Sequence, residues 1–275
     1  MADQTAAPSA FDRVAPRYDR EFTDQQLGAL LRGAVWREME AAFHPGDSVL
    51  DLGCGTGEDA CHLAHAGVNV LGLDASAAML EMAVAKARRA EFTDRVRFAQ
   101  LDLREVDAGY DLLHFTGGNQ IDGAYSNFGP LNCLPDRVPL ASALARAIRP
   151  GGTFIAVVMG PTCPWEFSWF LLHGHPRTAT RRYRRGFRSV VGGQELRVWY
   201  PSPRTLRREF EPAFDHVKTV GVGVFLPPSD LGRLVTRVPR LFSQLNAVDD
   251  RARNHFPWTW LNDHYLSVFR RRDEG

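Results

Sequence analysis

The stretch Val49-Leu50-Asp51-Leu52-Gly53-Cys54-Gly55-Thr56-Gly57-Glu58 decides the fold of this chain, because three glycines follow directly on an apolar run. The run Ser48–Leu52 predicts a buried strand, and residues 59–66 predict a helix that Gly67 ends. A strand, a glycine-rich turn and a helix start bring backbone N–H groups and a positive dipole end to one place. Glycine has no Cβ, so a large polar ligand can approach the main chain there. The turn therefore predicts a nucleotide-like ligand.

The same alternation of short apolar runs and helical patterns continues beyond the turn. Further strands are predicted at residues 69–73, 96–99 and 153–159, and helices at 25–43, 77–89 and 140–148. For the fourth strand, residues 110–115 and 121–126 are both candidates, because periodicity does not separate two short apolar runs. Strands that alternate with helices predict an α/β fold with a parallel sheet covered on both faces. The glycine turn then lies at the carboxyl edge of the sheet, where such folds bind ligands.

The tail of the chain departs from this alternation. A helix is predicted at residues 164–173, a hairpin at 187–200 around Gly192-Gly193, and a second helix at 204–210. Strands are predicted at residues 217–225 and 265–270, with helical material between them at 229–254. We expect these insertions to form an α+β cap beside the sheet.

Bulk composition excludes several classes of protein. With 275 residues, 44% of them hydrophobic, and a net charge of +1, the chain predicts one globular protein rather than a general nucleic-acid binder. The four cysteines fit no zinc or redox spacing, so we expect no metal site and no disulfide framework. Residues 1–9 lack the layout of a signal peptide, and no apolar run approaches the roughly 20 residues of a membrane span. Together these features predict a reduced, cytoplasmic protein.

The spacing of the glycines limits the classes of ligand that the turn could bind. A dinucleotide-binding turn has G-x-G-x-x-G, but here Glu58 stands at its third glycine position, and the phosphate-binding G-x-x-x-x-G-K-[ST] pattern is absent. The pattern D-x-G-x-G-x-G instead resembles motif I of the class I S-adenosylmethionine-dependent methyltransferases. Three more segments match this family in order: Asp74 after the second strand, Asp102-Leu103 after the third, and Pro150-Gly151-Gly152 before the fifth.

This resemblance implies a Rossmann-like, doubly wound seven-stranded sheet, mostly parallel, with an antiparallel last strand near Asp263-His264-Tyr265. It implies S-adenosylmethionine as cofactor and S-adenosylhomocysteine as product. Asp51 and the glycine turn would face the methionine end of the cofactor, Asp74 the ribose hydroxyls, and Asp102-Leu103 the adenine. Asp74 as a helix cap and Asp102 as a turn residue are the alternatives. The implied cofactor residues are Tyr18, Asp51, Gly53, Cys54, Gly55, Gly57, Asp74, Ala75, Met79, Asp102, Leu103, Asn127 and Phe128.

Two segments outside motif I sharpen the comparison. Residues 11–19 resemble the F-D-x-x-A-x-x-Y-D segment of many relatives, which implies that Tyr18 covers the cofactor as part of a lid. Residues 121–133 resemble the F-D-G-x-x-S-N-F-G-x-L-N-C segment of a bacterial small-molecule subgroup, which makes 121–126 the fourth strand. The amino-directed DNA enzymes carry N/D-P-P-Y/F where this chain has S-N-F-G, so we expect no DNA substrate. Asn127 and Asn132 could also be turn residues.

Methyl transfer is an in-line displacement, so the protein mainly positions donor and acceptor, and a base is needed only for a protic acceptor. Among His173, His175, His255 and His264, the resemblance favours His264 as the catalytic candidate, with a structural histidine as the alternative.

We predict that the methyl acceptor is bound by Asn132, Trp165, Arg181 and Arg184. The two arginines belong to the arginine-rich segment 177–188. This loop indicates an anionic acceptor, RNA, or only a solvated surface.

The predicted domains are a helical lid at 1–45, the cofactor-binding core at 46–160, and cap insertions with the closing strands at 161–275. The function indicated is methylation of a small molecule, such as a secondary metabolite, at oxygen, nitrogen or carbon. RNA or protein methylation and a non-catalytic cofactor-binding scaffold are the alternatives. The sequence does not set the oligomeric state.

Overall fold

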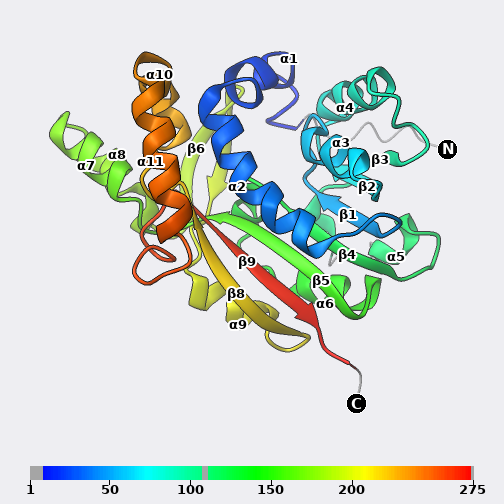
Figure 1. The fold of residues 1–275 in the computed structure, drawn as a ribbon. Coiled ribbons are helices and arrows are strands. Elements are labelled where there is room, and N and C mark those ends of the chain that lie inside the picture. Colours follow the sequence, from blue (N-terminus) through cyan, green and yellow to red (C-terminus); the bar gives the residue numbers. More distant parts are fainter. Residues whose placement is uncertain (1–8, 107–110, 274–275) are drawn as a thin grey trace.

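The computed structural model describes residues 9–106 and 111–273, and a seven-stranded sheet runs through its centre (Figure 1). The strand order is β3-β2-β1-β4-β5-β9-β8. Strands β1 to β5 are parallel, and β9 is antiparallel to both of its neighbours, β5 and β8. This confirms the predicted doubly wound sheet with an antiparallel last strand. The strands of the sheet are β1 (Ser48–Leu52), β2 (Asn69–Asp74), β3 (Val96–Gln100), β4 (Ile121–Ser126), β5 (Ile148–Met159), β8 (Phe214–Val222) and β9 (His264–Arg271).

Helices cover both faces of the sheet. They are α1 (Ala15–Tyr18), η1 (Asp19–Thr23), α2 (Gln26–Ala42), α3 (Glu58–His65), α4 (Ala77–Arg89), η2 (Leu103–Glu105), α5 (Leu112–Phe115), η3 (Pro130–Cys133) and α6 (Val138–Ala147). Two insertions complete the chain. Between β5 and β8 lie α7 (Pro164–Leu172), α8 (Pro176–Ala179), η4 (Arg181–Tyr183), the hairpin β6 (Phe187–Val191) and β7 (Gln194–Val198), and α9 (Pro203–Phe210). Between β8 and β9 lie η5 (Ser229–Leu231), α10 (Gly232–Arg237) and α11 (Pro239–Ala252).

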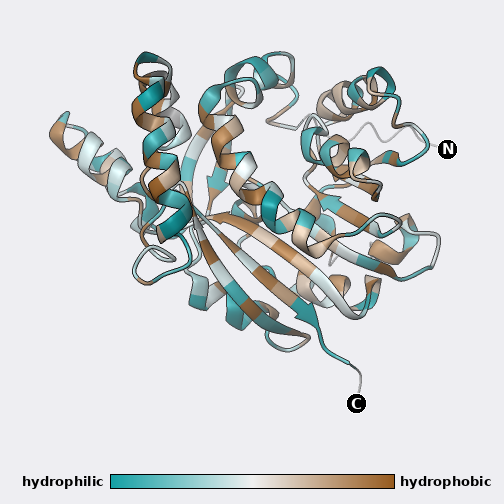
Figure 2. Cartoon of the chain, viewed as in Figure 1, coloured by the Kyte–Doolittle hydropathy of each residue, from teal (hydrophilic) through white to brown (hydrophobic). Residues whose placement is uncertain are grey.

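The two faces of the sheet bury two separate apolar clusters, as the strand periodicity requires. On β5, Ile155 and Val157 pack in the cluster under α2, α3 and α11. Phe154, Ala156 and Val158 pack in the other cluster, against α6 and α9. Hydrophobic residues accordingly concentrate along the strands in Figure 2. Because the central strands are buried on both faces, they fix the positions of the residues at their carboxyl ends.

The strand register brings polar and aromatic side chains to the carboxyl edge of the sheet. Asp51 of β1 lies opposite Tyr125 of β4, and Leu52 lies opposite Leu73 of β2. At the same edge His264, the first residue of β9, pairs with Met159, the last residue of β5.

The structure resolves the ambiguous strand and shifts some boundaries. Residues 121–126 form the fourth strand, whereas Leu112–Phe115 is a short helix capped by Asp111, and Tyr110 lies outside the described residues. Pro150-Gly151-Gly152 does not precede the fifth strand but lies within it, because α6 ends at Ala147 and β5 already begins at Ile148. Gly151, at φ 72°, lies inside β5 where the pairing with β4 is irregular. Strand β8 ends at Val222, three residues earlier than expected, since Gly223 at φ 68° turns the chain.

Candidate cofactor and acceptor site

The glycine turn after β1 uses its three glycines differently. A Cβ on Gly53, at φ 79°, would lie 2.1 Å from Cγ of Pro130, and one on Gly57 would lie 3.0 Å from Ala83 and Phe98. Both positions therefore need glycine for packing. Gly55, at φ 53°, has no atom within 4 Å of the corresponding point. The open space beside Gly55 is where a ligand can reach the main chain.

The turn presents fewer unpaired N–H groups than expected, because four of its N–H groups have partners within the protein. The N–H groups of Gly53 and Cys54 both donate to the carbonyl of Leu73, at 2.7 and 3.0 Å, and that of Gly57 donates to Cys54 at 2.9 Å. The N–H of Gly55 donates to Oδ2 of Asp74 at 2.8 Å. These bonds hold the turn against β2.

Asp74 lies at the end of β2 and joins the turn to α4. Its Oδ1 accepts from the N–H of Ser76 at 2.8 Å, while Oδ2 accepts from Gly55. Burial raises the pKa of Asp74. The helix cap of α4 is Ser76, whose hydroxyl accepts from Met79 N–H, so Asp74 is not itself the cap. Ala75 is half-buried and Met79 is buried.

The N-terminal segment closes over this edge. Asp12 accepts from the Ser76 hydroxyl at 2.6 Å, and Asp19 accepts from the Thr56 hydroxyl at 2.6 Å and pairs with Lys86 at 2.9 Å. Between these anchors Tyr18 is half-buried. Burial raises the pKa of its hydroxyl; Arg32 opposes this rise, while the carboxylates of Asp59 and Asp74 add to it. Tyr18 thus lies near the charges of Arg32, Asp59 and Asp74.

A cluster of buried polar atoms marks the floor of the site. Asn127 Oδ1 has no partner among the described residues, while Asp51 Oδ2 and the Tyr125 hydroxyl, on residues that lie opposite each other on β1 and β4, have only each other. Burial, reinforced by the nearby charge of Asp59, raises the pKa of Asp51 well above its usual range. Such groups cost free energy, about 1–3 kcal/mol each, unless a ligand or water satisfies them.

A buried network that the sequence analysis missed lies beside them. Asp59 accepts from Arg32 at 2.6 Å, from the Trp36 indole at 2.7 Å and from the Asn127 amide at 2.9 Å. Burial opposes its ionisation, but the Arg32 charge and these bonds lower the pKa of Asp59. The available signals were Arg32 and Trp36, four residues apart on the apolar side of a predicted helix, and an acid directly after motif I.

Aromatic rings line the space next to this network. The Phe128 ring, whose residue has φ 51°, meets Phe22 edge-on at 5.7 Å and His264 edge-on at 5.3 Å. The Arg32 guanidinium lies over both phenyl rings, at 5.5 Å from Phe22 and 5.4 Å from Phe128. The site thus combines aromatic faces with one cation and several carboxylates.

His264 lies at the end of a chain of buried charged side chains. Its Nδ1 lies 3.0 Å from Oδ2 of Asp263, and the other oxygen of Asp263 pairs with Arg182 at 2.5 Å. Arg182 also pairs with Glu166 at 2.7 Å, and all four side chains are buried. Burial opposes ionisation of Asp263, yet His264 and Arg182 lower its pKa. The chain joins α7 to the first residues of β9.

Three of the four side chains predicted for the acceptor are engaged with different partners within the protein. Asn132 bonds Met159 and Trp199 through every group of its side chain, which ties β5 to the end of the hairpin. The Trp165 indole donates to Phe225 at 3.0 Å. Arg181 pairs bidentately with Glu166 at 2.8 and 2.9 Å, and Arg184 is exposed.

At the far side of the turn, Asp102 is half-buried and caps η2, with Leu103 next to it. Burial opposes its ionisation, but hydrogen bonds from Arg104 lower the pKa of Asp102. Cys54 is buried, and burial raises the pKa of its thiol well above the usual range. No group of three His, Cys, Asp or Glu side chains in residues 9–106 and 111–273 could hold a metal ion.

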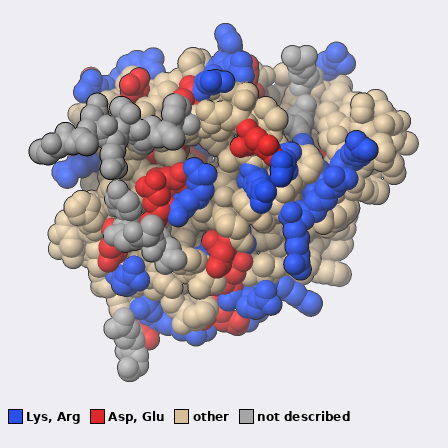
Figure 3. All heavy atoms as spheres, turned by 180° about the vertical axis from the view of Figure 1, so that it is seen from behind, with Lys and Arg blue, Asp and Glu red and all other residues tan. Residues whose placement is uncertain are grey.

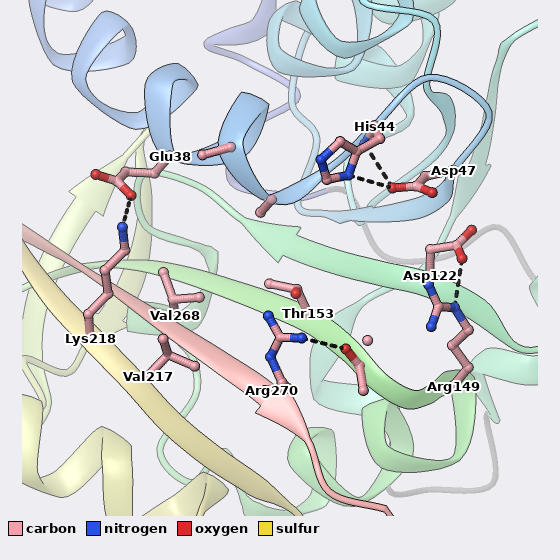
Figure 4. A pocket seen from close by; sticks show the side chains of 14 residues that line it. Glu38, His44, Asp47, Asp122, Arg149, Thr153, Val217, Lys218, Val268 and Arg270 are labelled. Carbon is pink, nitrogen blue, oxygen red and sulfur yellow. Dashed lines mark hydrogen bonds and ion pairs between the residues drawn. The ribbon is translucent and has the colours of Figure 1, made fainter.

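A hollow of about 350 Å³ lies at the opposite, amino-terminal edge of the sheet (Figure 4). Its charges are largely paired with one another: Lys218 with Glu38 at 2.5 Å and Arg149 with Asp122 at 2.8 Å. It contains none of the residues predicted from motif I, and we assign the site to the carboxyl edge instead.

Comparison with known proteins agrees with this geometry. A family described as "Methyltransferase domain" matches residues 49–152. Trans-aconitate 2-methyltransferase of Deinococcus radiodurans is 38% identical over 131 residues, which are 46% of this chain and 44% of that protein. Demethylmenaquinone methyltransferase of Renibacterium salmoninarum is 30% identical over 204 residues, which are 72% of this chain and 78% of that protein. The chain belongs to the class I S-adenosylmethionine-dependent methyltransferase family.

Solved structures support the fold. The CcbJ methyltransferase from Streptomyces caelestis superposes with a TM-score of 0.60 at 17% identity, covering 97% of this chain and 99% of that one. The matched segment spans less than half the length of the Deinococcus relative. No helix in the described part of this chain is both long and apolar enough to cross a bilayer.

Proposed function

We propose that this protein transfers the methyl group of S-adenosylmethionine to a small-molecule acceptor. The observation that carries the proposal is the buried polar cluster at the ends of β1 and β4: Asn127 Oδ1 has no partner among the described residues, and Asp51 and Tyr125 have only each other. The amide oxygen of Asn127 accepts hydrogen bonds, and so does the Asp51 carboxylate once a cation beside it favours ionisation, so both suit the ammonium of the cofactor's amino-acid end. The relatives named for trans-aconitate and demethylmenaquinone support a small molecule as the acceptor.

The remaining groups of the site suit the other parts of the cofactor. Arg32, whose Nε has no partner among the described residues, would meet the carboxylate. Asp74 would accept from the ribose hydroxyls beside the open space at Gly55, and Asp102 with Leu103 would bound the adenine. Tyr18 would cover the site. In this arrangement residues 1–45 act as a lid, of which residues 1–8 lie outside the described part, 46–160 as the core, and 161–275 as the acceptor cap.

When bound, S-adenosylmethionine supplies a methyl carbon whose bond to sulfur breaks, with the electron pair kept by sulfur, as the acceptor's lone pair forms the new bond. The protein's contribution is orientation, which can be worth roughly 7–11 kcal/mol for a well-aligned pair. The rings of Phe22 and Phe128 would exclude water and favour the positive charge on sulfur. For a protic acceptor, His264 would take the proton, since the Asp263 carboxylate 3.0 Å from its Nδ1 would stabilise the imidazolium.

RNA is a weaker candidate for the acceptor. Arg181 and Arg182, which would have to contact a phosphate backbone, are both paired with Glu166. An anionic small acceptor and a cytoplasmic location stay predictions from the sequence.

Titration calorimetry with S-adenosylmethionine, S-adenosylhomocysteine and NAD tests the proposal. We expect the first two to bind and NAD not to bind. Asp74→Ala should weaken both affinities at least tenfold, or ~1.4 kcal/mol, because the ribose loses its carboxylate. The control is Asp94→Ala, an exposed aspartate that should leave binding unchanged. NAD binding, or equal affinities for the two variants, would contradict the assignment.

A further inference from the structure

Helix α7 projects from the body of the protein and carries apolar side chains into solvent. In Figure 1 it lies at the left margin, beyond α11 and away from the sheet. Leu172 at its end is 84% exposed, Leu171 is 49% exposed and Phe167 is 37% exposed. Tyr183 of the neighbouring η4, which meets Phe167 edge-on at 6.5 Å, is also exposed. A cluster of exposed apolar side chains on the outside of a protein marks an interaction surface.

The residues that follow α7 are cationic. Between Pro161 and Gln194 the sequence holds a single carboxylate, Glu166, and it is buried in ion pairs with Arg181 and Arg182. Arg177, Arg184 and Arg185 are exposed, and no ion pair of theirs with a carboxylate occurs among the described residues. Seen from behind, the projecting part on the right of Figure 3 is free of charged side chains and has a run of basic ones beside it. Residues 164–185 therefore carry an apolar tip next to arginines, and their one carboxylate, Glu166, is buried.

We propose that residues 164–185 dock on the surface of an anionic lipid bilayer. Apolar and aromatic side chains of an interfacial helix enter the boundary between headgroups and acyl chains, while neighbouring arginines pair with anionic headgroups. Charge complementarity favours a lipid surface over a second copy of the chain. A two-fold dimer through this surface would bring two sets of arginines together without a carboxylate between them. The protein would lie on the bilayer, and the proposal does not depend on methyl transfer.

Flotation of the purified protein with lipid vesicles tests this proposal. We expect binding to vesicles of phosphatidylcholine mixed with phosphatidylglycerol, little binding to phosphatidylcholine alone, and weaker binding as salt is added. The double substitution Leu171→Ser with Leu172→Ser should reduce binding to the anionic vesicles at least about tenfold. Its matched control replaces Leu241 and Val248 of α11, each 47% exposed, by serine and should bind like the wild type.

A second pair of variants tests the contribution of charge. Arg184→Glu with Arg185→Glu should also reduce binding at least about tenfold and flatten its salt dependence. Arg88→Glu with Arg89→Glu, on exposed positions of α4, should not. As a control, thermal unfolding of each variant is followed by circular dichroism to check that the variant is folded.

Three results would overturn the proposal. The wild type could stay with the unbound protein in both vesicle preparations. The α11 control could lose as much binding as the α7 variant. Size-exclusion chromatography could show a dimer that the α7 substitutions dissociate, which would assign the surface to a second copy of the chain.

Discussion

At the scale of single residues, two glycines of one turn serve different purposes: Gly53 is required for packing, and Gly55 leaves room for a ligand. Gly53→Ala should lower the free energy of unfolding by more than about 3 kcal/mol, because the new Cβ overlaps Pro130 at 2.1 Å in a left-handed backbone. Gly55→Ala should cost only about 1–2 kcal/mol from its backbone conformation, since nothing lies within 4 Å. Urea denaturation measures both. The methyl group at position 55 should nevertheless weaken cofactor binding in calorimetry, and equal destabilisation by the two variants would contradict the geometry.

At the scale of elements, Asp249 ties α11 to the segment after β8 by accepting from Val224 and Phe225 at 2.9 and 3.2 Å. Burial raises its pKa to about 6, above the value near 3.9 of an unfolded chain. The folded state therefore binds the proton more tightly, so this contribution to stability is full below pH 4 and is lost as the pH rises through 6. Asp249→Asn, whose amide oxygen can accept the same bonds, should remove this pH-dependent loss. The free energy of unfolding of the variant, relative to that of the wild type, should therefore be ~2–3 kcal/mol higher at pH 8 than at pH 4. Urea denaturation at both pH values measures this, and a pH-independent difference between the proteins would contradict it.

At the scale of the whole molecule, Arg182 links the inserted cap to the sheet through Glu166 and Asp263. Arg182→Met should lower the free energy of unfolding by about 3–5 kcal/mol, because it leaves Asp263 charged and buried with His264 as its remaining ion-pair partner. Arg184→Met, two residues away and exposed, should change it by no more than about 0.5 kcal/mol. Urea denaturation compares the two variants, and a loss below about 1 kcal/mol for Arg182→Met would show that the cap is held by other contacts.

The sequence predicted the alternating strands and helices of the core and the glycine turn well, because periodicity and the spacing of Gly53, Gly55 and Gly57 are local signals. It did not predict the Asp59–Arg32 pair, whose members are 27 residues apart and meet only when α2 packs on α3. The same limit applies to the arginine-rich loop. Sequence showed a dense run of cations, but only the fold shows that Arg181 and Arg182 turn inward to Glu166 while Arg184 stays outside.

The most direct test of the account is a crystal structure of the protein soaked with S-adenosylhomocysteine. We expect its ribose hydroxyls within hydrogen-bond distance of Asp74, and its ammonium beside Asp51 and Asn127. Density for the compound at the hollow near Arg270, or a carboxyl edge that holds none, would contradict the central claim.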